Sequence, residues 1–221
     1  MNNIRGTLFD LDGTLLDSAP DLVAALNWLR SFEGLAALDV REMSRYVSRG
    51  AAGLIKAGMP AVDQRQFETW KAKFLGYYAE NYFEQSRLFA GVQELLHFLG
   101  QAGIPWGIVT NKMESLTLPI LRAAGIFEDA SCVVCGDTLN TNKPDPAPVV
   151  LACRTLQVPL DSTVFVGDHI HDLQAGRAAG TLTAVVHYGY GIYEPEDDLV
   201  TGSLQIYHPA DLIDIINAQS A

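Results

Sequence analysis

Two carboxylates, Asp10 and Asp12, are separated by a single residue and followed by a glycine in the segment Phe9-Asp10-Leu11-Asp12-Gly13-Thr14. Carboxylates this close together can supply a nucleophile, a general acid or base, or ligands for a hard cation such as Mg²⁺. The same pattern is also typical of an aspartate-rich turn. Its meaning therefore depends on what the rest of the chain brings to the same place.

Three further segments carry polar groups that would complement these carboxylates. Thr110 and Asn111 offer a hydroxyl and an amide, and Lys143 offers an amine in a proline-stiffened loop. Asp168 and Asp172 offer two more carboxylates. Each lies after a short apolar run that is typical of a strand. Because ligands of open α/β sheets bind outside the carboxyl ends of the strands, all four segments are expected to meet in one site.

The strands that would position these groups are visible as apolar runs. Five are predicted, at residues 7–9, 106–110, 132–134, 164–166 and 183–186. From the second run onward they alternate with helical patterns, which is typical of a parallel sheet built from βαβ units. Cys132 and Cys135 form a C-x-x-C pair, but it falls on a strand rather than at a helix start. We therefore interpret them, and Cys153, as structural thiols.

The interval from 16 to 88 breaks this alternation. It holds no convincing strand, and helices are predicted at residues 22–30, 42–46, 50–57 and 67–82. The segment Ser18-Ala19-Pro20-Asp21 is similar to a capping box at the start of the first helix. An all-helical block after the first strand of an α/β sheet indicates an inserted domain. The expected division is a core of residues 1–15 and 89–221 with a helical domain at 16–88.

Composition excludes several classes of protein. The chain has 221 residues, of which 48% are hydrophobic, so it can build a core without disulfides and is not intrinsically disordered. A formal charge of −11 opposes a broad nucleic-acid or anionic-membrane surface. No run approaches the apolar length of a membrane span, and no secretory signal is visible. Three cysteines, an odd number, suit a reducing compartment, so we expect a cytoplasmic protein. From the charge and the apolar runs, we expect neither nucleic acid nor membrane as a partner.

Taken together, the segment 10–14, Thr110, Lys143 and the pair Asp168 and Asp172 resemble the four signature motifs of the haloacid dehalogenase superfamily, in their usual order. The resemblance covers the whole chain, and the helical insert stands where the family has its cap. It implies a Rossmann-like three-layer α/β/α fold with a parallel sheet and an inserted all-helical cap domain. It also implies a Mg²⁺-dependent phosphatase.

Within the superfamily, the chain is similar to the phosphoglycolate phosphatase branch. That similarity is carried by Trp106-Gly107-Ile108-Val109-Thr110-Asn111-Lys112, Lys143-Pro144-Asp145-Pro146 and Ala175-Gly176-Arg177-Ala178-Ala179-Gly180. A narrower similarity, to N-acetylmuramic acid 6-phosphate phosphatases, is carried by Ser86-Arg87-Leu88-Phe89 and His187-Tyr188-Gly189-Tyr190. Either substrate, or another small phosphorylated metabolite, is compatible with the sequence.

The resemblance also implies roles for the motif residues. Asp10 attacks phosphorus and becomes an aspartyl-phosphate, while Asp12 serves as general acid and then as general base. Mg²⁺ lies on Asp10, the backbone carbonyl of Asp12, and Asp168, with Asp172 in support. Lys143, Thr110 and the backbone N–H of Asn111 stabilise the phosphoryl oxygens.

Substrate choice is expected to lie in the insert. Ser48, Arg49 and Gly50 combine a hydroxyl, a guanidinium and a small residue near a predicted helix start, which suits an anionic or hydroxylated substrate. Arg49 could equally lie on the solvated face of that helix. His169 and His171 are potential ligands of a transition metal, but the carboxylates around them favour a hard cation.

Two other functions stay open at this stage. A sugar phosphomutase would use the same nucleophile and return the phosphoryl group to the sugar. A regulatory binding protein could share the fold without catalysing a reaction, although no motif position holds an inert residue. A monomer or a homodimer is expected.

Overall fold

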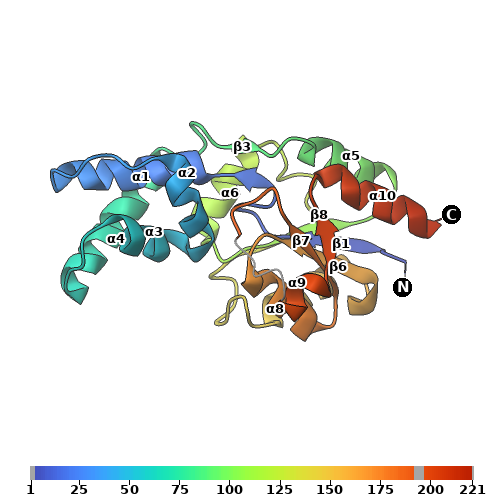
Figure 1. Ribbon diagram of the computed structural model, residues 1–221. Helices are drawn as coiled ribbons and strands as arrows, with labels where there is room; N and C mark the ends of the chain where they lie inside the picture. Colours follow the sequence, from blue (N-terminus) through green and yellow to red (C-terminus); the bar gives the residue numbers. More distant parts are fainter. Residues whose placement is uncertain (1–2, 192–196, 221) are drawn as a thin grey trace.

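The computed structural model describes residues 3–191 and 197–220, and its centre is a six-stranded sheet in the order β5-β4-β1-β6-β7-β8 (Figure 1). All five strand pairings are parallel. The strands are β1 (Gly6–Phe9), β4 (Trp106–Val109), β5 (Cys132–Val134), β6 (Thr163–Gly167), β7 (Leu182–Val186) and β8 (Leu204–Ile206). The five predicted strands are confirmed, and β8 is an addition that the sequence analysis missed.

Helices cover both faces of the sheet because side chains alternate between the faces along each strand. Phe9 and Ile108 belong to the apolar cluster that includes α5 (Val92–Gln101), α6 (Glu114–Ala123) and α10 (Pro209–Ser220). Leu8 and Val109 point the other way. They pack in a second cluster with α7 (Ala147–Leu156) and α8 (Ile170–Ala179), beside which lies α9 (Asp198–Thr201). The three-layer α/β/α arrangement is therefore confirmed.

A group of helices lies together at one end of the molecule, drawn blue to teal in Figure 1. It consists of α1 (Ala19–Phe32), α2 (Val40–Met43), the 3₁₀ helix η1 (Ser44–Arg49), α3 (Gly50–Gly58) and α4 (Gln64–Glu80). Helix α4 begins where the Asp63 carboxylate accepts a hydrogen bond from the backbone N–H of Gln66. Its four-residue spacing of Trp70, Phe74 and Tyr78 buries one aromatic face within this group.

The junction of these helices with the sheet corrects two predictions. The interval is not free of strands, because β2 (Leu16–Asp17) pairs antiparallel with β3 (Arg87–Leu88) where the chain leaves and returns. Ser18 precedes α1 but makes no capping hydrogen bond. The Asp21 carboxylate instead accepts bonds from the backbone N–H groups of Gln85 and Ser86, which ties the start of α1 to the returning segment.

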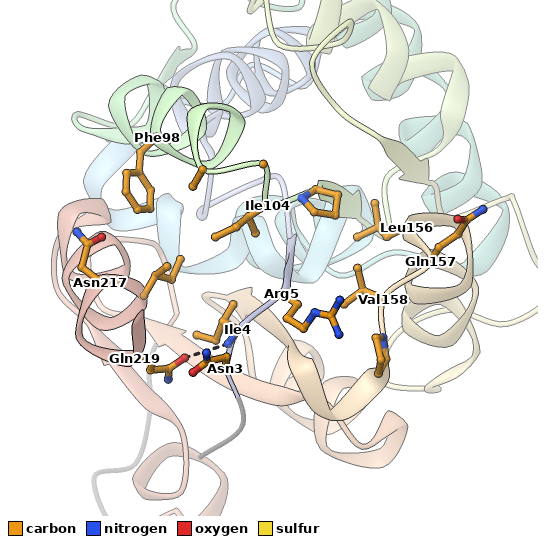
Figure 2. Close-up of a pocket in the computed structure, with 15 residues that line it drawn as sticks. Asn3, Ile4, Arg5, Phe98, Ile104, Leu156, Gln157, Val158, Asn217 and Gln219 are labelled. Carbon is orange, nitrogen blue, oxygen red and sulfur yellow. Dashed lines mark hydrogen bonds between the residues drawn. The ribbon is translucent and has the colours of Figure 1, made fainter. Parts of the chain in front are cut away.

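The two ends of the sheet differ in character. At the amino ends of the strands, a cavity of about 650 Å³ is lined by Arg5, Ile104 and Val158, as Figure 2 shows. There the backbone N–H of Ile4 donates to the Gln219 side chain, which joins the segment before β1 to α10. The predicted site residues lie at the opposite, carboxyl ends. Among the described helices, none has the length and apolar character needed to cross a membrane.

Candidate active site

A pocket of about 510 Å³ lies at the carboxyl end of the sheet, between the sheet and the group of helices α1–α4. Nine of the ten predicted site residues line it: Asp10, Asp12, Ser48, Arg49, Gly50, Thr110, Asn111, Lys143 and Asp172. The tenth, Asp168, is fully buried directly beside it. The strand ends therefore converge as the sequence analysis expected.

Lys143 is the cation at the floor of this pocket. Its Nζ lies 2.6 Å from Oδ1 of Asp10 and 2.7 Å from Oδ1 of Asp172, and it donates to the carbonyl of Val109 at 2.8 Å. Burial alone would lower the pKa of Lys143, but attraction to both carboxylates raises it above its ordinary value. The amine is therefore held charged where no water is needed to satisfy it.

Asn111 fixes the loop that carries Lys143. Its side-chain amide donates to the carbonyl of Lys143 at 3.0 Å, and its side-chain oxygen accepts from the backbone N–H of Lys143 at 3.1 Å. Thr110 is buried, and its hydroxyl oxygen accepts a bond from the backbone N–H of Lys112. The side chains of Thr110 and Asn111 thus shape the loops, while both residues line the pocket.

Three buried carboxylates gather at the inner end of the pocket, where Asp10 and Asp172 line it and Asp168 lies beside them. One oxygen each from Asp10, Asp168 and Asp172 lies within 4.8 Å of the others. Burial raises the pKa of Asp10 to about 6, with Lys143 opposing and Asp172 adding to the rise. Burial, followed by repulsion from Asp10 and Asp172, raises the pKa of Asp168 well above its ordinary value. All of these ligand atoms are oxygens, so the donor set fits a hard divalent cation.

Asp168 is oriented by several donors from different parts of the chain. The backbone N–H of Tyr190 donates to its Oδ2 at 2.9 Å, and the Ser48 hydroxyl donates to the same oxygen at 3.2 Å. Gly13 adopts a φ of +92°, and a Cβ there would lie 2.2 Å from Oδ2 of Asp168. The glycine of the first motif therefore gives the backbone room to approach this carboxylate.

Lys112 is a functional candidate that sequence reasoning did not single out. Its Nζ lies 2.7 Å from Oδ1 of Asp12 and donates to the Tyr78 hydroxyl at 3.0 Å. Tyr78 is buried on α4, so this contact joins the helical group to the sheet. Its position directly after Thr110 and Asn111, at a strand end, was the available signal for Lys112. Nothing in the sequence indicated which aromatic residue of α4 would meet it.

Two predicted residues of the insert, Arg49 and Gly50, lie where η1 ends and α3 begins. Arg49 is exposed and lies over the Tyr46 ring at 5.4 Å, while Gly50 has a φ of +66°.

The two histidines, His169 and His171, lie at the start of α8. His169 caps this helix, and burial together with the neighbouring His171 lowers the pKa of His169 to about 4. Within the described ranges, the group of close-set metal-ligand atoms contains aspartates and no histidine.

Comparison with known proteins settles the family. The family model for haloacid dehalogenase-like hydrolases matches residues 7–186. The chain belongs to this family. An N-acetylmuramic acid 6-phosphate phosphatase of Pseudomonas aeruginosa is 37% identical over 217 residues, which are 97% of this chain and 95% of the relative. A phosphoglycolate phosphatase of Xanthomonas campestris is also 37% identical, over 93% of this chain and 96% of the relative.

Solved structures agree with this assignment. The crystal structure of a predicted phosphoglycolate phosphatase from Haemophilus somnus 129pt has a TM-score of 0.84 and 30% identity. The match covers 97% of this chain and 99% of that one. The resemblance noted in the sequence is confirmed, and so is the prediction of an enzyme of the phosphatase class.

Proposed function

We propose that this haloacid dehalogenase-like phosphatase is a Mg²⁺-dependent phosphomonoesterase that acts on a small phosphorylated metabolite of the phosphoglycolate or N-acetylmuramic acid 6-phosphate type. The observation that carries the proposal is the contact of Lys143 with Asp10 and Asp172 at the floor of the pocket. A phosphoryl group entering there would meet a carboxylate nucleophile beside a buried cation.

In the proposed reaction, a carboxylate oxygen of Asp10 attacks phosphorus and the ester P–O bond breaks, which leaves an aspartyl-phosphate. Asp12, held by Lys112 at 2.7 Å, gives a proton to the departing alkoxide. Asp12 then takes a proton from water as the water attacks phosphorus. The products are an alcohol and orthophosphate, and Asp10 is regenerated. Lys143, Thr110 and the Asn111 N–H stabilise charge on the phosphoryl oxygens.

The residues suited to hold Mg²⁺ are Asp10, Asp168 and the backbone carbonyl of Asp12. When bound, the ion supplies positive charge that lets an anionic nucleophile approach a phosphate dianion. Asp172 would support the site indirectly, since it bonds both Lys143 and the backbone N–H of His169.

Residues 16–88 would act as a cap over a catalytic core of residues 1–15 and 89–221. The cap would carry Ser48, Arg49 and Gly50 to the substrate and exclude water from the pocket. The enzyme would act in the cytoplasm, where its three buried thiols would stay reduced.

Orthophosphate release from a panel of phosphomonoesters tests the proposal. We expect release with Mg²⁺, loss of release when the metal is chelated, and recovery when Mg²⁺ is added back. Asp10→Asn should lower turnover by at least about a thousandfold without changing the circular dichroism spectrum. Asp214→Asn, at an exposed aspartate of α10, is the matched control and should change nothing.

Two results would contradict the proposal. Transfer of the phosphoryl group within a hexose phosphate, without orthophosphate release, would favour the phosphomutase. Binding of phosphate esters with no turnover of any of them, in the presence of Mg²⁺, would favour a regulatory binding protein.

A further inference from the structure

The pocket extends from the phosphoryl end along one face of α4. Tyr78 marks the inner end, where its hydroxyl meets Lys112 beside Asp12. Phe74 lies one turn earlier along α4, and Lys71 lies almost two turns earlier than Tyr78, and both line the same pocket. At 1.5 Å per residue, the seven residues from Lys71 to Tyr78 correspond to about 10 Å along the helix axis.

The cations of this pocket fall into two kinds. Lys112 and Lys143, at the inner end, are each paired with carboxylates. Arg49 and Lys71 also line the pocket, yet neither forms an ion pair with any residue in the ranges 3–191 and 197–220. Lys71 is half-buried. The chain as a whole carries a formal charge of −11, so the protein has an excess of acidic groups. A half-buried cation without an ion pair, facing a cavity of an acidic protein, favours an anion as its partner.

Along α4, the side chains between Lys71 and Tyr78 that line the pocket are apolar, Phe74 and Leu75. The other apolar lining residues include Leu22, Val47, Met113 and Leu116, and the polar ones include Asn142, His169 and His171. A substrate that reaches from the inner end to Lys71 must therefore present carbon surface along its middle. The carboxylate carbon of a two-carbon phosphoester lies three bonds of about 1.5 Å from phosphorus, which is too short to span this stretch.

We infer that Lys71 binds a second anionic group of the substrate at the outer end of the pocket. The inference rests on the proposed function and narrows it: the substrate is a phosphomonoester of sugar size that also carries a carboxylate. A two-carbon phosphorylated acid fills only the inner end. Lys71 is then a residue that determines specificity, and it takes no part in the chemical step.

The test compares two sugars that differ in the acid alone. N-acetylmuramic acid 6-phosphate carries a lactyl carboxylate, which N-acetylglucosamine 6-phosphate lacks. Lys71→Met should raise KM for the first by roughly tenfold to a hundredfold, leave its kcat within about twofold, and leave both constants for the second unchanged. Lys71→Arg should keep most of the discrimination because it keeps the charge.

Lys73→Met is the matched control. Lys73 lies on the same helix two residues away, is exposed, and sits over the Phe32 ring instead of the pocket. It should change KM for neither sugar, and thermal melting of all variants would show that the fold is intact.

The outcomes separate the inference from the function beneath it. Equal KM changes for both sugars, or none for either, would overturn the role of Lys71 while leaving the phosphatase assignment in place. Preference of the unaltered enzyme for phosphoglycolate over both sugars would overturn the substrate class. Absence of orthophosphate release from every ester would overturn the proposed function itself.

Discussion

At the scale of single residues, Gly13 shows how closely the site is built. Its φ of +92° lies in the left-handed region, and a Cβ would lie 2.2 Å from a carboxylate oxygen of Asp168. Two separate costs therefore act at this position, one from the backbone and one from the displaced carboxylate. Gly103 has a similar φ of +66° but open space around it.

Comparing Gly13→Ala with Gly103→Ala separates these two costs. Gly103→Ala should lower the free energy of unfolding by about 1–2 kcal/mol, the cost of a left-handed residue, and leave turnover unchanged. Gly13→Ala should lower it further and lower kcat by more than about a hundredfold, because Asp168 must move. Urea unfolding and orthophosphate release measure the two effects. If both variants behaved alike, the packing of Gly13 against Asp168 would not matter for the reaction.

The sequence predicted which motif residues would meet but not all of their contacts. Asp10, Thr110 and Lys143 could be placed together because they follow neighbouring parallel strands, whose carboxyl ends share one edge. The Lys112–Tyr78 contact could not be predicted. It depends on how α4 sits over the end of β4, and nothing local in either segment encodes that placement.

At the scale of elements, the segment 188–190 after β7 connects the carboxylate cluster with the junction of the helical group. The Tyr190 backbone N–H donates to Asp168, while its hydroxyl donates to Asp17 and accepts from the backbone N–H of Ala19. The Tyr190 ring also packs near Phe89, in the returning segment. One residue thus contacts the site and both chain segments that cross the junction.

Tyr190→Phe should expose the importance of this hydroxyl. The change leaves the Asp17 carboxylate without its donor and the Ala19 N–H without its acceptor. We expect a loss of roughly 1–3 kcal/mol in the free energy of unfolding. Tyr207→Phe, at an exposed ring, is the control and should stay within about 0.5 kcal/mol of the unaltered protein. Denaturant titration measures the unfolding midpoint of both variants. An unchanged midpoint for Tyr190→Phe would contradict the expectation.

Elements were predictable where local sequence alone defines them. The strands β4 and β6 are continuous apolar runs, as buried parallel strands require. The pair β2 and β3 has two residues in each strand, too few to show a period, and it exists only because the two segments meet. β8 could not be predicted for a similar reason, since its three residues become a strand only by pairing with β7.

At the scale of the whole molecule, the reactivity of the three thiols shows whether the core is folded. Cys132, Cys135 and Cys153 are free and buried on or beside the central sheet. Burial raises the pKa of Cys132 and of Cys135 to about 11, and it raises that of Cys153 above its ordinary value. Because the thiolate is the reactive form, these cysteines should be inert while the protein is folded.

Alkylation with iodoacetamide tests this expectation. At pH 8 a thiol of pKa about 11 is only about 0.1% thiolate, against about 10% for one of pKa 9 in the unfolded chain. Cys132 and Cys135 should therefore react at least about a hundredfold more slowly in the folded protein than in urea, and Cys153 should also react more slowly than in urea. The native rate should rise about tenfold per pH unit between pH 8 and pH 10. Mass spectrometry counts the modified cysteines, and rapid native modification at pH 8 would contradict their burial.

The central position of β1 has a consequence for synthesis of the chain. Thr7 pairs with Trp106 on one side and with Val164 on the other, so the strand made first waits for both of its neighbours. At typical translation rates of about 5–20 residues per second, this wait lasts roughly 8–30 seconds. The helices of residues 19–80 emerge within that time. The part of the molecule that lies over the site is therefore available to fold on the ribosome before the sheet beneath it exists.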